Sequence, residues 1–446
     1  MLPLELLRAH GTDAVSFQAL ESGLTWWHDA AGAVPYAETD GGWVAAGRPL
    51  AADGDVGVVA RRFIDSARAA GRRASFFATE DPSRLPGCEA LLLGEQPIFL
   101  PREWEATLAA RRRLREQLRR ARAKGVRVRA VDATELAPGA PLRAEVERLT
   151  RAWLTSRRME PMGFLVSVEP FHAPEQHRYL AAERDGVMVA FLSAVPIYAR
   201  RGWLVEDVLR APEAPNGTAE LLLDALMRDV AADSDLVTLG LAPLSGHAPA
   251  WQRAARWLTR PLYDFRGVRA FKERLRPARW EPVWLVYPEG EPAAAHLVDA
   301  LRAFARGPLW RFGLRTAARH PGVPPWLLAL PLAPWTAILA VRAAFGMTSL
   351  LGWSRPVLGA WAAFDAVLCV ALFRIALRPS ARGLWLAAGA AALDAALSLH
   401  HLAAVGLGQT AMQSAFRIIQ CAAPVVGVLA LGWAAWRMST RSLTRQ

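Results

Sequence analysis

The stretch that decides the fold is WLVEDVLRAPEAPNGTAELLLDALMRDVAADSDLVTLGLAPL, residues 203–244. Its first residues, 203–209, form a mostly apolar run that predicts a β-strand, and a proline-rich loop follows. A helix is predicted to start at residues 216–218, because the apolar residues after this point recur at helical spacing. A second short apolar run precedes Gly240. The pattern therefore predicts strand, loop, helix and strand, the unit of an α/β fold.

Polar side chains come toward the end of the first predicted strand. Asp207 and Arg210 lie there, and Asn216, Gly217 and Thr218 open the helix that follows. The free backbone N–H groups and the dipole of a helix start stabilise a phosphate or a developing negative charge. We therefore expect a substrate site between the strand end and the helix start.

The segments before this stretch continue the same pattern. Short apolar runs separated by glycine and proline fill residues 1–95 and indicate an α/β domain. Residues 126–131 predict a strand, residues 142–156 a helix, and residues 179–197 a hairpin that turns at Asp185-Gly186. Mixed strands and helices in this order are typical of an acyltransferase of the GNAT type.

Two further motifs follow the deciding stretch. YDFRGVRAFK covers residues 263–272, and Trp280-Glu281-Pro282 comes shortly after it. Together with Asp207, Arg210 and the Ala242-Pro243-Leu244 segment, they make residues 90–290 resemble the cytosolic catalytic domain of the lysylphosphatidylglycerol synthases, the multiple peptide resistance factor family. The chain departs from that family at Val283-Trp284, where arginine and tyrosine usually follow, which puts lysine and phosphatidylglycerol in doubt as the particular substrates.

The resemblance implies two GNAT-like lobes in tandem and a membrane domain. We expect a first lobe at residues 1–125, a catalytic lobe at 126–290, a basic amphipathic linker at 291–320 and a four-helix transmembrane domain at 321–446. The implied reaction moves an aminoacyl group from a charged tRNA to a hydroxyl of a membrane lipid. Asp207 and Arg210 are the expected catalytic residues. The expected substrate-binding residues are Asn216, Gly217, Thr218, Gly240, Pro243, Tyr263, Phe265 and Lys272.

A strongly basic helix is predicted before residue 125. Residues 111–124 hold eight basic groups and one acid, Glu116. The arginines could bind tRNA phosphates, which would make binding dependent on salt, or lie on anionic lipid headgroups. A helix whose arginines are only solvated is the third interpretation. The tRNA interpretation involves Arg111, Arg112, Arg115, Arg119 and Arg122.

Two other functions remain open from the sequence. One is an acyltransferase that takes acyl-CoA or an acyl carrier protein and makes an acylated amino-acid lipid, although only Gly217 and Ala219 stand where such enzymes have a glycine-rich loop. The other is an inactive protein that binds lipid or tRNA.

Four apolar runs follow residue 320, and each has about the 20 residues needed to cross a bilayer. The arginines cluster before the first run, between the second and third, and after the fourth. The positive-inside rule therefore predicts a multi-pass protein of a bacterial cytoplasmic (inner) membrane with both termini in the cytoplasm. Asp365 and Asp394 fall inside the second and third runs, at similar predicted depth, and should face protein or a polar cavity. The runs are 325–345, 357–377, 384–405 and 418–436.

No metal or cofactor site is predicted. The three cysteines are far apart in the chain, which argues against a zinc site or a disulfide framework. His172 and His177 lack companion ligands at metal spacing and are interpreted as surface histidines. Ser245, His247 and Asp264 lack a nucleophile-elbow motif, so a catalytic triad is not predicted. The oligomeric state cannot be read from the sequence.

Overall fold

The computed structural model describes residues 3–157, 159–245, 265–346, 354–406 and 411–443. The chain divides into two compact units, Met1–Gly313 and Leu314–Gln446. The first unit contains the strands, and the second is helical.

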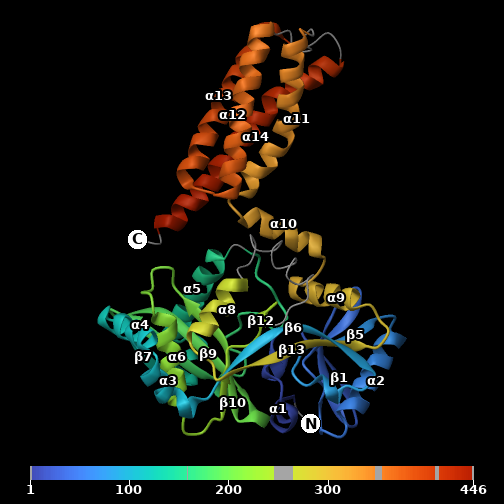
Figure 1. The fold of residues 1–446 in the computed structure, drawn as a ribbon, viewed down its shortest axis with the longest axis vertical. Helices are drawn as coiled ribbons and strands as arrows, with labels where there is room; N and C mark the ends of the chain where they lie inside the picture. The colour runs from blue at the N-terminus through green and yellow to red at the C-terminus, as the bar shows by residue number, and fades with distance from the viewer. Residues whose placement is uncertain (1–2, 158, 246–264, 347–353, 407–410, 444–446) are drawn as a thin grey trace. The chain divides into compact units, whose positions relative to one another are not determined.

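A single mixed sheet runs through the described part of the first unit (Figure 1). Its strand order is β1-β2-β3-β5-β13-β6-β11-β10-β9-β8-β7, with β4 paired to β2 and β12 paired to β6. The strands on the first-lobe side are β1 (Thr25–Asp29), β2 (Gly32–Glu38), β3 (Gly42–Ala46), β4 (Leu50–Ala51), β5 (Arg73–Thr79) and β13 (Arg279–Pro288). Those on the second-lobe side are β6 (Cys88–Phe99), β7 (Arg127–Val131), β8 (Arg178–Arg184), β9 (Val187–Ile197), β10 (Gly202–Arg210), β11 (Leu236–Thr238) and β12 (Ala242–Pro243).

The last strand of the unit joins its two lobes. Strand β13 lies between β5 and β6, and Figure 1 shows β6 and β13 crossing the middle of the unit. Its pairing with β6 runs antiparallel from Arg279 opposite Ile98 to Pro288 opposite Cys88. Residues 279–288 therefore complete the sheet beside a first-lobe strand, although the sequence prediction placed them in the second lobe.

Helices cover the sheet in both lobes. Helix α2 packs against β5, and the second-lobe helices share one hydrophobic core. Leu114, Leu118 and Ala121 of the basic helix belong to this second-lobe core, together with Leu222 and Leu226. The predicted boundary at residue 125 assigns the basic helix to the first lobe, whereas the helix packs in the core of the second. The helices are α1 (Pro3–His10), α2 (Val56–Ala69), α3 (Trp104–Ala110), α4 (Arg112–Ala123), α5 (Pro141–Ser156), α6 (Thr218–Asp229), α8 (Phe265–Arg274), α9 (Ala293–Ala305) and α10 (Leu309–Arg319).

The predicted strand, loop, helix and strand of the deciding stretch are confirmed as β10, α6 and β11. Strands β10 and β11 are parallel neighbours, with Gly202 opposite Leu236. The predicted hairpin is also confirmed as β8 and β9. Asp185 and Gly186 both have positive φ angles, as a two-residue hairpin turn of the favoured twist requires.

Among its described residues, the second unit contains four helices that are long and apolar enough to cross a membrane. They are α11 (Val323–Phe345), α12 (Arg355–Leu377), α13 (Ala381–Val405) and α14 (Ala411–Leu443). The prediction of an α/β domain followed by four apolar helices is confirmed. Asp365 is 1% exposed, and a cavity of 300 Å³ among these helices is lined by both Asp365 and Asp394. The expectation that both carboxyl groups face the inside of the bundle is therefore confirmed.

Candidate functional site

A β-bulge in the centre of the second lobe places two acidic residues side by side. In the β10–β9 pair, Val205 lies opposite Ala194 and Asp207 lies opposite Ser193, so Glu206 is the extra residue of the bulge. Such bulges re-aim side chains and are common next to active sites. Glu206 and Asp207 therefore depart from the simple alternation of a strand.

Asp207 is buried within the sheet layer. The Ser193 hydroxyl donates a hydrogen bond to its carboxyl Oδ2 over 3.4 Å. Burial raises the pKa of Asp207 well above its usual value, and the nearby charge of Glu206 raises it further. Asp207 lies inside β10 and not at its end, because the strand continues to Arg210.

Arg210 is the last residue of β10 and is half-buried. Three regular strand positions separate it from Asp207, so the two side chains point to opposite faces of the sheet. Within the described residues, no ion pair joins them. The sequence also allowed a structural salt bridge between Asp207 and Arg210, and the described residues do not show one. A substrate that contacts both side chains would have to reach both faces of the sheet.

Two histidines turn toward Glu206. His177 Nε2 lies 3.5 Å from one carboxylate oxygen of Glu206, and His172 Nε2 lies 3.9 Å from the other. The side chains of His177 and Glu206 are 0% and 2% exposed, and that of His172 is 11% exposed. The prediction of surface histidines is therefore wrong, since a 3₁₀ turn (η5, Pro174–Gln176) between them brings both rings onto β10.

Further carboxyl groups surround this position. Glu21 follows the 3₁₀ helix η1 (Ala14–Leu20), and burial raises its pKa to about 9, with the charges of Glu206, Glu169 and Asp207 acting in the same direction. Glu169 accepts hydrogen bonds from the backbone N–H and hydroxyl of Ser22. We call Glu21, Glu169, Glu206 and Asp207 the acid cluster.

A surface pocket of 460 Å³ opens beside the acid cluster. It lies along α5 and the segment before η5, and it is large enough for a small polar ligand. Glu169 and His172 contribute to its wall, so the pocket reaches the rim of the cluster. Its lining residues are Glu147, Thr150, Arg151, Val168, Glu169, Pro170, Phe171 and His172.

The predicted helix start has contacts within the protein. A Cβ on Gly217, whose φ is 96°, would lie 2.8 Å from the carbonyl oxygen of Gln117 in α4, so the glycine allows α4 to approach. The buried Thr218 hydroxyl donates to the carbonyl of Pro215, while Asn216 is exposed. The start of α6 is therefore packed against α4, and these contacts do not bring residues 216–218 to Asp207.

Lys272 also has an internal role. Its ammonium group donates to the carbonyl oxygens of Leu239, Gly240 and Leu241 over 2.7, 2.8 and 2.9 Å. These three bonds use every donor of the group. Burial lowers the pKa of Lys272 to about 7. In this structure the ammonium group holds the loop after β11, and the proposed contact of Lys272 with a phosphate would require it to give up one of these bonds.

The other predicted substrate-binding residues shape the same loop or lie outside the description. Gly240 has a φ of 66°, and Pro243 pairs with Gly94 in the β12–β6 ladder. Tyr263 lies outside the described residues, and Phe265 is the first residue of α8. Ser245 donates to the carbonyl of Ala242, whereas His247 and Asp264 lie outside the described residues.

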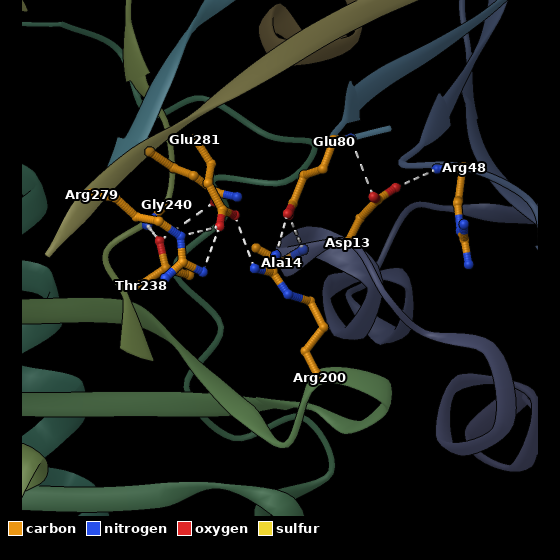
Figure 2. A network of polar contacts seen from close by, with 10 residues as sticks. Asp13, Ala14, Arg48, Glu80, Arg200, Thr238, Gly240, Arg279 and Glu281 are labelled. Atoms are coloured by element: carbon orange, nitrogen blue, oxygen red, sulfur yellow. Dashed lines mark hydrogen bonds and ion pairs between the residues drawn. The ribbon is translucent and has the colours of Figure 1, made fainter. Parts of the chain in front are cut away.

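A partly buried polar network, which we call the Arg200 network, joins the two lobes, as Figure 2 shows. Arg200, in the 3₁₀ turn η6 (Tyr198–Arg200), forms ion pairs with Glu80 and Glu281. Glu80 also accepts the N–H of Ala14 over 2.6 Å, and Asp13 accepts the N–H of Glu80 over 3.2 Å. Glu281 of the Trp-Glu-Pro motif thus has a structural role, since it links β13 to η6.

The arginines of the basic helix divide into two groups. Arg119 pairs with Glu116, Arg122 pairs with Asp224, and Arg115 donates to the carbonyl oxygens of Leu108 and Ala109. Arg111 and Arg112 are exposed, and no ion pair to them occurs within the described ranges. Three of the five arginines proposed for tRNA are therefore engaged within the protein.

Sequence reasoning missed Glu206, Glu21 and the histidine pair. One signal was present, because consecutive acids in the apolar strand WLVEDVLR cannot both point outward in a regular strand. Nothing local in the sequence connects Glu21 to β10, since 185 residues separate it from Glu206.

Comparison with known proteins adds the family. The model described as "Phosphatidylglycerol lysyltransferase, C-terminal" matches residues 4–287, which is more than half of the chain. The chain belongs to this family. The match spans both lobes and the strand β13 that joins them, and it ends before α9 and the four apolar helices.

Curated relatives share a shorter region. The lysylphosphatidylglycerol biosynthesis bifunctional protein LysX of Mycobacterium sp. (strain KMS) is 31% identical over 157 residues, which cover 32% of this chain and 14% of LysX. The phosphatidylglycerol lysyltransferase of Bacillus subtilis (strain 168) is 26% identical over 155 residues, or 32% of this chain and 18% of that protein. The chain therefore spans less than a fifth of the length of these relatives.

Solved structures share the fold. The C-terminal domain of a putative lysylphosphatidylglycerol synthetase from Agrobacterium fabrum has a TM-score of 0.57 at 22% identity, and the match covers 68% of this chain and 96% of that one. The structure of L-PGS from Bacillus licheniformis has a TM-score of 0.58 at 21% identity, with 67% and 95% covered. At this identity the likeness establishes the fold alone, and it confirms the predicted two-lobed α/β architecture.

Proposed function

We propose that the chain is a membrane-anchored transferase that moves an aminoacyl group from an aminoacyl-tRNA to a hydroxyl of a phosphatidylglycerol-like lipid. The observation that carries this proposal is the family match over residues 4–287 in a chain that also has four potential membrane spans. Membrane spans on the same chain would hold the α/β unit near a lipid acceptor. We further propose that both termini lie in the cytoplasm of a bacterial cell. The arginines cluster before the first helix, between the second and third, and after the fourth, and the positive-inside rule places these segments in the cytoplasm.

The proposed chemistry is an ester exchange. The lipid hydroxyl oxygen attacks the aminoacyl carbonyl carbon, and the ester bond to the tRNA ribose breaks. Asp207 receives the proton of the attacking hydroxyl and returns it to the departing ribose oxygen. Its burial and its hydrogen bond from Ser193 support a fixed position for such a group.

Arg210 is proposed to stabilise the charge that develops on the carbonyl oxygen. It is half-buried at the end of β10, and no carboxylate pairs with it in the described part of the chain. Both groups must reach the same carbonyl centre, so we propose that the long side chain of Arg210 bends around the end of β10 toward the side of Asp207. The exposed Arg111 and Arg112 are proposed to contact tRNA phosphates.

The experiment is a transfer assay with the full chain in phosphatidylglycerol vesicles. Charged tRNA with a radiolabelled amino acid is added, and lipid products are identified by mass spectrometry. Labelled aminoacyl lipid that disappears after ribonuclease treatment supports the proposal. A product that forms with acyl-CoA and survives ribonuclease would support the N- or O-acyltransferase instead, and no product from any donor would support an inactive binding protein.

A further inference from the structure

We propose that His172, His177 and Glu206 bind a divalent transition-metal ion, with zinc as the metal that best suits this ligand set. One ligand atom from each residue lies within 4.8 Å of the other two. Two imidazoles and one carboxylate form the protein ligands of many zinc sites that keep a position open for another ligand. This inference is independent of the proposed aminoacyl transfer.

The hydrogen bonds of the histidines prepare both rings for a metal. His172 Nδ1 donates to the carbonyl oxygen of Glu169 over 2.6 Å, and His177 Nδ1 donates to that of Ala173 over 3.1 Å. A carbonyl oxygen can only accept, so each Nδ1 carries a proton, and the neutral form of each ring then has a free lone pair on Nε2. Backbone carbonyls fix the tautomer of metal-binding histidines in this way.

The atoms that face one another lack any other partner. Nε2 of both histidines and both carboxylate oxygens of Glu206 are buried without a hydrogen bond. When both rings are neutral, the two Nε2 lone pairs and the carboxylate repel each other, and buried polar atoms without partners destabilise the fold. A cation between them satisfies all three groups.

The separations suit a metal of zinc's size. With bonds of about 2.0–2.2 Å, neighbouring ligands of a tetrahedral ion lie about 3.3–3.6 Å apart. His177 Nε2 lies 3.5 Å from Oε2 of Glu206, His172 Nε2 lies 3.9 Å from Oε1, and one ligand atom from each of the three residues lies within 4.8 Å of the others. The three side chains must therefore move closer together to complete the coordination.

Further carboxyl groups and a surface pocket lie next to the three proposed ligands. Glu21 and Asp207 place two further buried carboxyl groups beside Glu206, and a bound cation would favour the ionised form of each. His172 lines the 460 Å³ pocket while its Nε2 atom is buried, so a rotation of this ring would admit an ion from the pocket side. The three residues also tie the η5 segment to the bulge that carries Asp207.

The test uses the full purified chain after metal removal with a chelator. Cobalt is added while the visible absorption is recorded, and zinc affinity is measured by competition with a chromophoric chelator. We expect one ion per chain, a cobalt spectrum of tetrahedral type, and an affinity lower by about 100-fold or more in His177→Ala and Glu206→Gln. His28→Ala and Glu213→Gln, at exposed positions, are the matched controls and should bind as the wild type does.

The Glu206→Gln variant separates loss of metal binding from loss of folding. Its amide can donate to a neutral Nε2, so the metal-free variant should melt at or above the temperature of the metal-free wild type, and zinc should raise the melting temperature of the wild type only. Zinc or cobalt binding that is absent from the wild type, or unchanged in both ligand variants, would overturn the proposal. A metal-free Glu206→Gln variant that melts lower would also overturn it, because that result indicates an imidazolium–carboxylate pair.

Discussion

Asp207 is a buried carboxyl group that Ser193 holds on β10. Asparagine has the same shape and can keep a hydrogen bond to Ser193, but it cannot accept a proton. We expect Asp207→Asn to lower the rate of lipid product formation at least about tenfold, within the range that a general base contributes. The rate is measured in phosphatidylglycerol vesicles, and the melting temperature of the variant should stay near that of the wild type. A wild-type rate in this variant would remove Asp207 from the chemistry.

Arg210 gives a separate prediction at the same scale. Arg210→Ala should lower the turnover rate at saturating donor and lipid by about tenfold or more if the guanidinium stabilises the transition state. Arg210→Lys should restore part of this rate, since it keeps a positive charge. The rate is measured in the same vesicle assay. Equal rates for the wild type and the alanine variant would show that Arg210 has no such role.

Lys272 fixes the loop after β11 with three hydrogen bonds. Methionine at this position has a similar length and no donor, so three carbonyl oxygens lose their partner. We expect Lys272→Met to reduce the free energy of unfolding of the α/β unit by about 3 kcal/mol, at about 1 kcal/mol for each bond. The loss is measured by denaturant unfolding of the full chain in detergent.

The control is Lys124→Met, because Lys124 is the other lysine of the chain and is exposed. It should leave stability unchanged. If Lys272→Met is equally stable but fails to bind donor, the lysine acts on the substrate and not on the loop.

At the scale of single elements, α4 combines a buried apolar side with exposed arginines. Replacing Arg111 and Arg112 with alanine should weaken tRNA binding and reduce the slope of log affinity against log salt by about 1–2, since each phosphate contact contributes about 0.7–0.9. The measurement is filter binding of tRNA to the full chain at several salt concentrations. Arg61→Ala, on the exposed side of α2, is the control. Equal slopes for the variant and the wild type would contradict a role of α4 in tRNA binding.

Helices α12 and α13 carry Asp365 and Asp394 on the wall of one cavity. Asp365→Leu should destabilise the helical unit, because Asp394 would then face an apolar group within the bundle, whereas Asp365→Asn should keep the fold. Stability is measured by heating the protein in detergent and following its monodisperse fraction. If Asp365→Asn also leaves lipid product unchanged, the pair is structural. A folded variant with reduced product would indicate that the cavity receives a lipid headgroup.

At the scale of the whole α/β unit, the Arg200 network makes the free energy of unfolding depend on pH. Burial and the charge of Asp13 raise the pKa of Glu80 to about 7. The native state therefore binds the proton more tightly than the unfolded chain does, and this contribution to stability is lost as pH rises toward 7. We expect Glu80→Gln to flatten the dependence of the unfolding free energy on pH between 5 and 7.5, by an amount on the order of 2 kcal/mol.

The measurement is denaturant unfolding of the full chain and of the variant at matched pH values. The difference between the two proteins isolates Glu80 from the other acids whose pKa is raised. Parallel curves would show that Glu80 does not titrate with folding in this range.

Local patterns in the sequence determined the elements. The β10, α6 and β11 series, the β8–β9 hairpin and the four apolar helices follow from periodicity, turn residues and length, because these signals act between residues that are close in the chain. The inward positions of Asp365 and Asp394 also followed, since a carboxyl group among lipid tails is too costly. Spaced motifs were enough to indicate the family.

Contacts between distant segments were decided by the tertiary structure alone. The insertion of β13 between β5 and β6, the burial of Lys272 against three carbonyls and the meeting of His172 and His177 with Glu206 all join residues that are far apart or that a loop reorients. A short sequence signal reports which side of a strand or helix is apolar, but it does not report which other segment covers that side. Asp207 and Arg210 are a different case, because their spacing of three residues in one strand already places the side chains on opposite faces, which the prediction of a shared site overlooked.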